Sequence, residues 1–149
     1  FFGRTAVFQK IFGKSSAAQN EIPCFNHKTN DPLEVDWVNG ACMFVRRAAI
    51  DKAGMLDEGF FMYWEDADWC FRIKRAGWKV FWLPEAEIIH LTGESSGKAK
   101  VKTLIYFHNS IYRYYRKNIN PAKLSLSAPV IRLLIYARLA MKIVMNTVK

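Results

Sequence analysis

Hydrophobic and polar positions follow two patterns along the chain. Short apolar runs bounded by Gly, Pro or Asn favour strands, whereas apolar residues that recur every three or four positions favour amphipathic helices. Both patterns occur in turn, so we predict an α/β fold in which a mixed sheet has flanking helices. The predicted strands are residues 35–45, 78–83 and 86–90, and the predicted helices are residues 46–53, 65–76 and 102–117.

The two ends of the chain differ from this central part. Residues 1–32 combine an amphipathic or irregular stretch with a loop rich in Pro and Asn, and we interpret them as a lead-in. Residues 119–149 form a basic amphipathic tail with a predicted helix over residues 130–145. At about 100° per residue, three cations share one side of that helix; they are Arg132, Arg138 and Lys142. This pattern fits a helix that lies in a membrane interface, and it fits a helix packed on the core equally well. The three charges argue against a helix that spans the membrane.

Composition and charge narrow the class of protein. Hydrophobic residues make up 51% of the 149 and aromatic ones 15%, which excludes a disordered chain. Residues 98–149 hold 11 Lys and Arg and no acid, whereas residues 1–97 hold 11 Lys and Arg against 13 Asp and Glu. The net charge of +9 therefore lies in the last third and predicts an anionic partner. An anionic membrane surface is favoured over nucleic acid, because no nucleic-acid motif accompanies the interleaved basic and aromatic residues.

Three carboxylates, those of Glu65, Asp66 and Asp68, lie within four positions among aromatic residues. Like charges this close repel, and apolar neighbours raise the cost of ionising them. Such a cluster is typical of a site where a metal, a cationic ligand or a proton transfer offsets the strain. The alternative is that Asp66 and Asp68 stabilise the start of a helix and pair with Arg72 or Lys74.

An ordered set of motifs surrounds these carboxylates. In order, they are Trp37-Val38-Asn39-Gly40-Ala41, Arg46-Arg47, Gly54-Met55-Leu56-Asp57-Glu58-Gly59-Phe60-Phe61, Glu65-Asp66-Ala67-Asp68, Gly77, Pro84 and His90-x-x-Gly93-x-Ser95. Over residues 33–118 the set resembles the C-terminal, acceptor-side half of the glycosyltransferase family 2 catalytic domain, which has the GT-A fold. The rhamnosyltransferase and galactofuranosyltransferase branch is the most similar. The order of the motifs is more specific than any one of them.

The resemblance implies an inverting, hexosyltransferase-type enzyme that moves a sugar from a nucleotide-sugar to a glycan or lipid-linked acceptor. Such a displacement needs a general base at the acceptor hydroxyl, and the matching residue is Asp66. Its neighbours Glu65 and Asp68 are expected to raise its pKa and to orient acceptor hydroxyls.

The resemblance also implies a divalent cation, Mg²⁺ or Mn²⁺, with His90 as a ligand; the alternative is an ordinary histidine at a strand edge. Other residues are expected to bind the acceptor or the donor sugar. They are Trp37, Asn39, Gly40, Ala41 and Arg72. Core packing is the alternative for Trp37, and a local ion pair is the alternative for Arg72.

One departure from the family concerns the start of the chain. Nothing before residue 33 resembles the family's N-terminal donor-binding half, and Asp66-Ala67-Asp68 matches the acceptor-side cluster instead of that half's D-x-D motif. The expectation is therefore a fragment that is inactive alone, from a cytoplasmic enzyme peripheral to the inner face of the cell membrane. The alternative function is a non-catalytic, membrane-peripheral binding module with a glycosyltransferase-like core.

Overall fold

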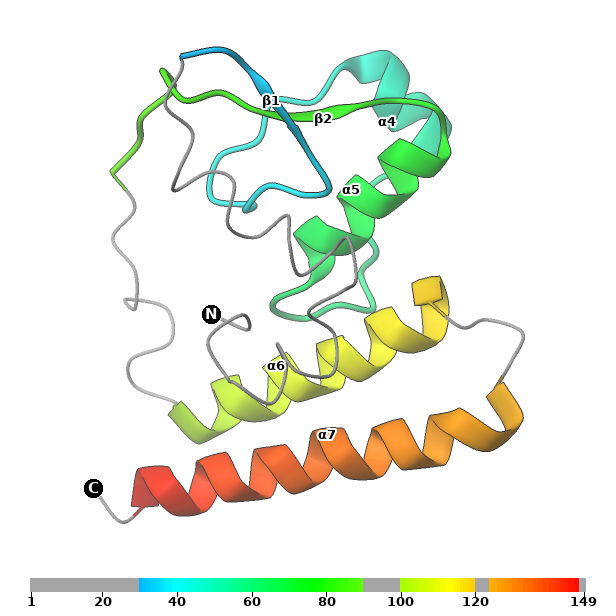
Figure 1. Cartoon of the computed structure of the whole chain (residues 1–149), viewed down its shortest axis with the longest axis vertical. Helices are drawn as coiled ribbons and strands as arrows, with labels where there is room; N and C mark the ends of the chain where they lie inside the picture. Colours follow the sequence, from blue (N-terminus) through cyan, green and yellow to red (C-terminus); the bar gives the residue numbers. More distant parts are fainter. Residues whose placement is uncertain (1–29, 90–99, 120–123, 148–149) are drawn as a thin grey trace.

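The computed structural model describes residues 30–89, 100–119 and 124–147. Figure 1 shows a small sheet with two shorter helices in one part of the molecule and a pair of long helices side by side in the other. This mixture of helices and strands confirms the predicted α/β fold and is consistent with part of a GT-A domain. The predicted lead-in, residues 1–32, lies almost wholly outside the described residues.

The described sheet has two antiparallel strands, β1 (Leu33–Val35) and β2 (Val80–Trp82). Leu33 pairs with Trp82, and Val35 pairs with Val80. The second pair is buried against helix α5 (Glu65–Arg75), which supplies the rest of the main core. The buried core residues are Val35, Trp69, Cys70, Ile73 and Val80.

Glycines end the two shorter helices, as predicted. Helix α4 (Arg47–Ala53) stops at Gly54, whose φ is 78° and whose N–H donates to the Ile50 carbonyl at 2.7 Å. Helix α5 ends at Arg75, two positions before Gly77, whose φ is 89°. Glycine adopts these left-handed conformations without the steric cost that a Cβ brings. Both predicted helices are therefore confirmed to within one residue at each end.

Gly77 allows a clean test of this conformational requirement, because a Cβ added there would meet nothing within 4 Å. We expect Gly77→Ala to lower the free energy of unfolding by about 1–2 kcal/mol, the cost of a left-handed residue with a Cβ. Gly77→Asn should cost less, since Asn tolerates this region. Urea unfolding of the three proteins measures the effect, and equal stability of all three would contradict the backbone explanation.

The long strand predicted over residues 35–45 is wrong beyond its first residue. Regular pairing ends at Val35, and residues 36–45 are a loop. The Asn39 side chain accepts a hydrogen bond from the Ala41 N–H at 2.9 Å, and the Gly40 N–H donates to Asp66. These N–H groups are therefore unavailable to a strand ladder, and the chain turns here instead.

Of the other two predicted strands, one is confirmed and one is wrong within the described residues. Residues 80–82 confirm the strand predicted over residues 78–83, although it is shorter. Residues 86–89, predicted as a strand, have no regular structure, and His90 lies outside the described residues. Their amides make local contacts instead: the Ala86 N–H donates to the Leu83 carbonyl at 3.2 Å, which forms a turn after Pro84.

Helix α6 (Lys100–Tyr114) confirms the amphipathic helix predicted over residues 102–117, with a change in its last turn. From Tyr115 to Ile119 it continues as a short π-helix, η1. A π-helix has more residues per turn than an α-helix, so consecutive side chains diverge less around the axis. This geometry lets Lys117 and Asn118 reach the same partner, Asp68.

Helix α7 (Leu124–Thr147) forms most of the predicted basic tail and runs beside α6, as Figure 1 shows. The tail helix begins at Leu124, earlier than the predicted residue 130, and Pro129 lies inside it. Among the helices that the structure describes, neither α7 nor any other combines the length and the apolar character that crossing a membrane requires.

Candidate active site

A cleft of about 460 Å³ lies where the loop after β1 meets the first turn of α5. It combines two carboxylates with an apolar rim. Its lining residues are Gly40, Ala41, Cys42, Met43, Phe44, Leu56, Glu65, Asp66 and Trp69. A second hollow, of about 320 Å³ beside Pro84, has Glu85 as its one ionisable group, so the first cleft is the better candidate for chemistry.

Asp66 is held at this cleft by two backbone amides. Its Oδ2 accepts from the Gly40 N–H at 2.9 Å and its Oδ1 from the Ala67 N–H at 2.7 Å. A carboxylate oxygen has two lone-pair sites, so each oxygen keeps one for a ligand. Within the described part of the chain Asp66 forms no ion pair. The arrangement fixes the carboxylate and leaves it able to accept a proton.

Gly40 is close enough to Asp66 to control its position. A Cβ at Gly40 would lie 3.4 Å from the Asp66 Cβ and 3.6 Å from its Oδ2. The absence of a side chain therefore lets the loop backbone approach the carboxylate and donate to it.

Glu65 lies beside Asp66 in the cleft and is half-buried. Its Oε2 is buried and has no hydrogen-bond partner among the described residues. Burial, followed by the negative charge of Asp66, raises the pKa of the Glu65 carboxyl above its ordinary value. Glu65 thus holds its proton more readily than an exposed glutamate, and a protonated carboxyl can donate a hydrogen bond to a ligand hydroxyl.

The backbone just before the two carboxylates is strained. Tyr63 and Trp64 have φ values of 65° and 69°, in the left-handed region that residues with a Cβ seldom adopt. Such residues cost about 1–3 kcal/mol each and cluster at functional sites. Here they reverse the chain so that Glu65 and Asp66 open helix α5 at the cleft.

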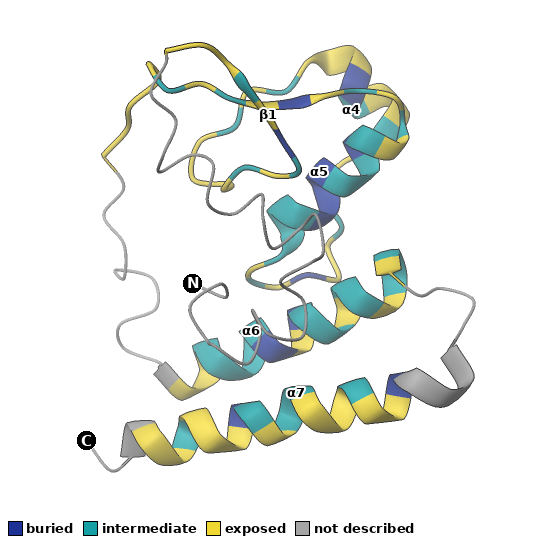
Figure 2. Ribbon diagram, viewed as in Figure 1, coloured by how far each residue is buried: buried dark blue, intermediate teal, exposed yellow. Residues whose placement is uncertain are grey.

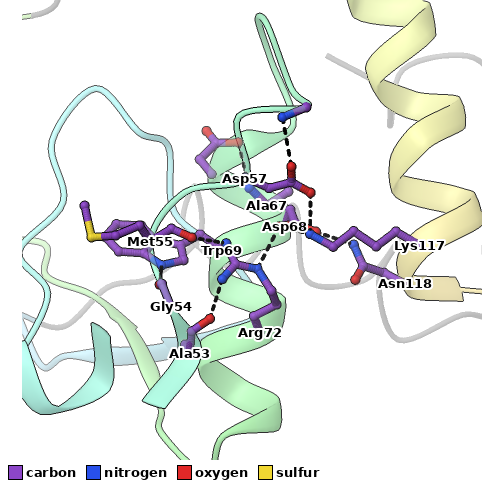
Figure 3. A network of polar contacts seen from close by, with 12 residues as sticks. Ala53, Gly54, Met55, Asp57, Ala67, Asp68, Trp69, Arg72, Lys117 and Asn118 are labelled. Atoms are coloured by element: carbon purple, nitrogen blue, oxygen red, sulfur yellow. Dashed lines mark hydrogen bonds and ion pairs between the residues drawn. The ribbon is translucent and has the colours of Figure 1, made fainter. Parts of the chain in front are cut away.

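Asp68 lies away from the cleft and is fully buried. In Figure 3 its carboxylate meets Arg72, Lys117 and Asn118, whose nitrogens donate at 2.8, 2.9 and 2.8 Å. Burial alone would raise the pKa of Asp68, but the hydrogen bonds from Asn118, Lys117 and Arg72 outweigh it and hold that pKa below the ordinary value. Asp68 therefore joins α5 to the end of α6 rather than facing a ligand.

Arg72 uses all its guanidinium nitrogens within the protein. Besides Asp68, it donates to the Ala53 carbonyl and, at 2.7 Å, to the Met55 carbonyl, as Figure 3 shows. The local ion pair considered for Arg72 is thus present, and it ties α5 to the residues after α4.

Lys117 extends this network to the loop before α5. It bridges Asp68 and Asp57, with 2.7 Å between its Nζ and the Asp57 Oδ2. The hydrogen bond from Lys117, helped by those from the Gly59 N–H and Arg113, holds the pKa of Asp57 well below its usual range. A Cβ at Gly59 would lie 2.0 Å from the Arg113 guanidinium, so a larger residue there would make the Arg113 side chain move.

The remaining predicted residues fall into three groups. Gly40 and Ala41 line the cleft, and Asn39 shapes their loop through its bond to the Ala41 N–H. Trp37 is 42% exposed and does not line the cleft, so neither core packing nor a position in this cleft describes it. His90, the predicted metal ligand, lies outside the described residues.

The predicted divalent cation requires side chains that can act as its ligands. Within residues 30–89, 100–119 and 124–147, no three His, Cys, Asp or Glu side chains come together as a metal site would require. Mg²⁺ is commonly held by one or two carboxylates together with water and substrate phosphates, and Glu65 and Asp66 supply two carboxylates at the cleft, so the divalent cation stays a prediction.

The sequence motifs do not indicate the apolar part of the cleft. Phe44 is 99% exposed and Leu56 is 45% exposed, although large apolar side chains favour burial. Phe44 follows the Asn39-Gly40 turn signal, which was the clue that its segment is not a buried strand. Lys117 and Asn118 were also missed, because their partner lies about 50 positions away in the sequence.

Comparison with known proteins places the chain in a family. The sequence model described as "Glycosyltransferase like family 2" matches residues 9–104. An N-acetylglucosaminyl-diphospho-decaprenol L-rhamnosyltransferase of Mycobacterium tuberculosis (strain ATCC 25618 / H37Rv) is 40% identical over 78 residues, covering 52% of this chain and 25% of that protein. The rhamnosyltransferase WbbL of Escherichia coli (strain K12) is 34% identical over 101 residues, covering 62% and 38%.

A third relative, the dTDP-rhamnosyl transferase RfbF of Shigella flexneri, is 32% identical over 72 residues, covering 48% of this chain and 24% of that protein. The matches thus span between 24% and 38% of these relatives' length. No solved structure matches the chain. Because the family model covers more than half of the residues, the chain belongs to glycosyltransferase-like family 2.

Proposed function

We propose that this chain is the acceptor-side part of an inverting glycosyltransferase that transfers rhamnose or a related sugar from a nucleotide-sugar to a glycan or lipid-linked acceptor. The observation that carries the proposal is the Asp66 carboxylate, fixed by the Gly40 N–H at the cleft and free to accept a proton. Family membership supports sugar transfer, and the names of the relatives support rhamnose and a lipid-linked acceptor.

In the proposed reaction one proton moves to Asp66 and one electron pair leaves with the nucleoside diphosphate. Asp66 takes the proton of the acceptor hydroxyl while that oxygen bonds to the anomeric carbon of the donor sugar. The bond from that carbon to the diphosphate breaks, and its electron pair leaves with the nucleoside diphosphate. Attack occurs from the face opposite the leaving group, so the configuration at the anomeric carbon inverts.

Glu65 and the apolar rim orient the acceptor in this scheme. Glu65 lies beside Asp66 in the cleft, where its carboxyl group can hydrogen-bond an acceptor hydroxyl next to the one that reacts. The exposed ring of Phe44 offers a flat apolar surface for the less polar face of a sugar.

The experiment uses a protein that contains this chain within a full-length family domain. It is supplied with dTDP-rhamnose and a lipid-linked N-acetylglucosamine acceptor, and NMR gives the anomeric configuration of the product. We expect transfer with inversion, and no transfer by the 149 residues alone. Retention of configuration would overturn the mechanism, and transfer by the isolated chain would overturn its assignment as one part of the catalytic domain.

A further inference from the structure

Helix α7 presents a continuous apolar face away from the rest of the protein. At 100° per residue its exposed apolar residues fall within an arc of about 140°. They form the outer face of α7, which comprises Val130, Leu133, Leu134, Ala137, Ala140, Met141, Val144 and Met145. Leu133 is 69% exposed and Met141 is 61% exposed. Figure 2 shows this side of α7 in the colour of exposed residues.

The opposite face of α7 is fixed against α6, so the outer face cannot turn inward without breaking contacts. Leu139 is buried, and the Tyr136 hydroxyl donates to the side-chain Oδ1 of Asn109 at 2.7 Å. The Arg132 guanidinium lies 5.8 Å from the ring centres of both Tyr112 and Tyr136. The apolar residues are therefore exposed because the inward face of the helix is already occupied.

The charge of this region indicates what covers the outer face. Arg138 and Met145, seven positions apart, lie about 20° apart around the helix, so a cation borders the apolar arc. Lys142 follows on the same side and is exposed. A second copy of the chain would bring two segments of residues 98–149 together, each with 11 cations and no acid, and they would repel. Anionic lipid headgroups are complementary to both the charge and the apolar arc.

We propose that the outer face of α7 docks on an anionic lipid surface, with the helix lying in the plane of the membrane interface. The apolar residues enter the boundary between headgroups and acyl chains, while the exposed Lys142 meets the headgroups. This arrangement needs no spanning segment, in keeping with the character of α7. At about 1.5 Å per residue, the helix would lie along roughly 36 Å of the surface.

Vesicle flotation of the 149-residue chain tests this proposal. Vesicles of phosphatidylcholine with phosphatidylglycerol are compared with vesicles of phosphatidylcholine alone, at low and high salt. We expect binding to the anionic vesicles that weakens with salt. The double variant Leu133→Glu, Met141→Glu should bind at least tenfold more weakly, because two charged groups replace apolar ones that enter the lipid. The matched control is Ile89→Glu, which changes a residue that is 93% exposed on another part of the protein.

Two further measurements keep the outcome interpretable. Circular dichroism checks that the double variant stays helical, and Lys142→Gln tests the charge without touching the apolar arc; it should weaken binding several-fold. Wild-type binding by the double variant, or binding that ignores anionic lipid and salt, would overturn the proposal. So would a dimer that the double variant dissociates, with no vesicle binding by the wild type. No sugar donor is present, so failure here leaves the proposed transfer activity unaffected.

Discussion

Asp66→Asn is expected to lower the kcat of sugar transfer by about 10²–10⁴-fold in a full-length family domain, the usual contribution of a general base. The amide has nearly the same shape as the carboxylate, and its one oxygen can still accept from the Gly40 N–H, although the Ala67 N–H then loses its acceptor. It cannot take a proton from the acceptor hydroxyl. Donor binding should change little, because the role proposed for Asp66 is at the acceptor. Initial rates and calorimetric titration of the donor measure the two effects separately.

Two matched variants sharpen this result. Asp51→Asn makes the same chemical change on the exposed surface of α4, where Asp51 pairs with Arg47, and should leave transfer unchanged. Glu65→Gln keeps a hydrogen-bond donor beside Asp66 and should reduce the rate less than Asp66→Asn does. If Glu65→Gln abolished transfer and Asp66→Asn did not, the base would be Glu65. Equal loss of donor binding and turnover in Asp66→Asn would also contradict the assignment.

Local signals in the sequence were enough to predict the helices around the cleft. Gly54 and Gly77 mark helix ends through their own conformational freedom, which needs no distant partner. The three-to-four spacing of apolar residues likewise locates α6, because one side of that helix packs on the rest of the protein. The position of Asp66 at the start of α5 follows from the same local reasoning.

Helical geometry predicts that the clustered carboxylates of α5 do not all face the same way. Asp66 and Asp68 are two positions apart, so they point about 160° away from each other around α5. Both could not face one cleft, and the structure places one at the cleft and the other in the buried network. The sequence showed the Arg72 partner of Asp68 four positions on, but Lys117 arrives through tertiary packing that no local pattern encodes.

The apolar residues within 36–45 favour a strand, but the turn residues of the same segment decide its structure. Asn39-Gly40 is a strong turn signal, and its amides bond to side chains rather than to a neighbouring strand. The apolar residues that follow, Met43 and Phe44, line the cleft instead of a sheet. Apolar side chains at a ligand site break the usual link between hydrophobicity and burial.

Asp68→Ala is expected to destabilise the described fold by about 3–5 kcal/mol, the cost of breaking a buried ion pair by removing one partner. The Arg72 Nε and the Asn118 Nδ2 would lose their acceptor in a site where Asp68 is 0% exposed. Lys117 would keep only Asp57. Urea unfolding gives the change in the free energy of unfolding. Asp51→Ala is the control, and its effect should stay within about 0.5 kcal/mol because Asp51 lies on the surface.

Acid unfolding tests whether the network stabilises the protein through the charge of these carboxylates. The pKa values of Asp57 and Asp68 are lower in the folded protein than the ordinary 3.8, so the unfolded chain binds protons first as the pH falls. Their contribution is therefore fully present above about pH 5 and is lost as the pH falls below about 4. The free energy of unfolding of the wild type should decline over that range, whereas Asp68→Ala should start lower and decline less steeply. Parallel pH profiles would show that Asp68 acts through packing and not through its charge.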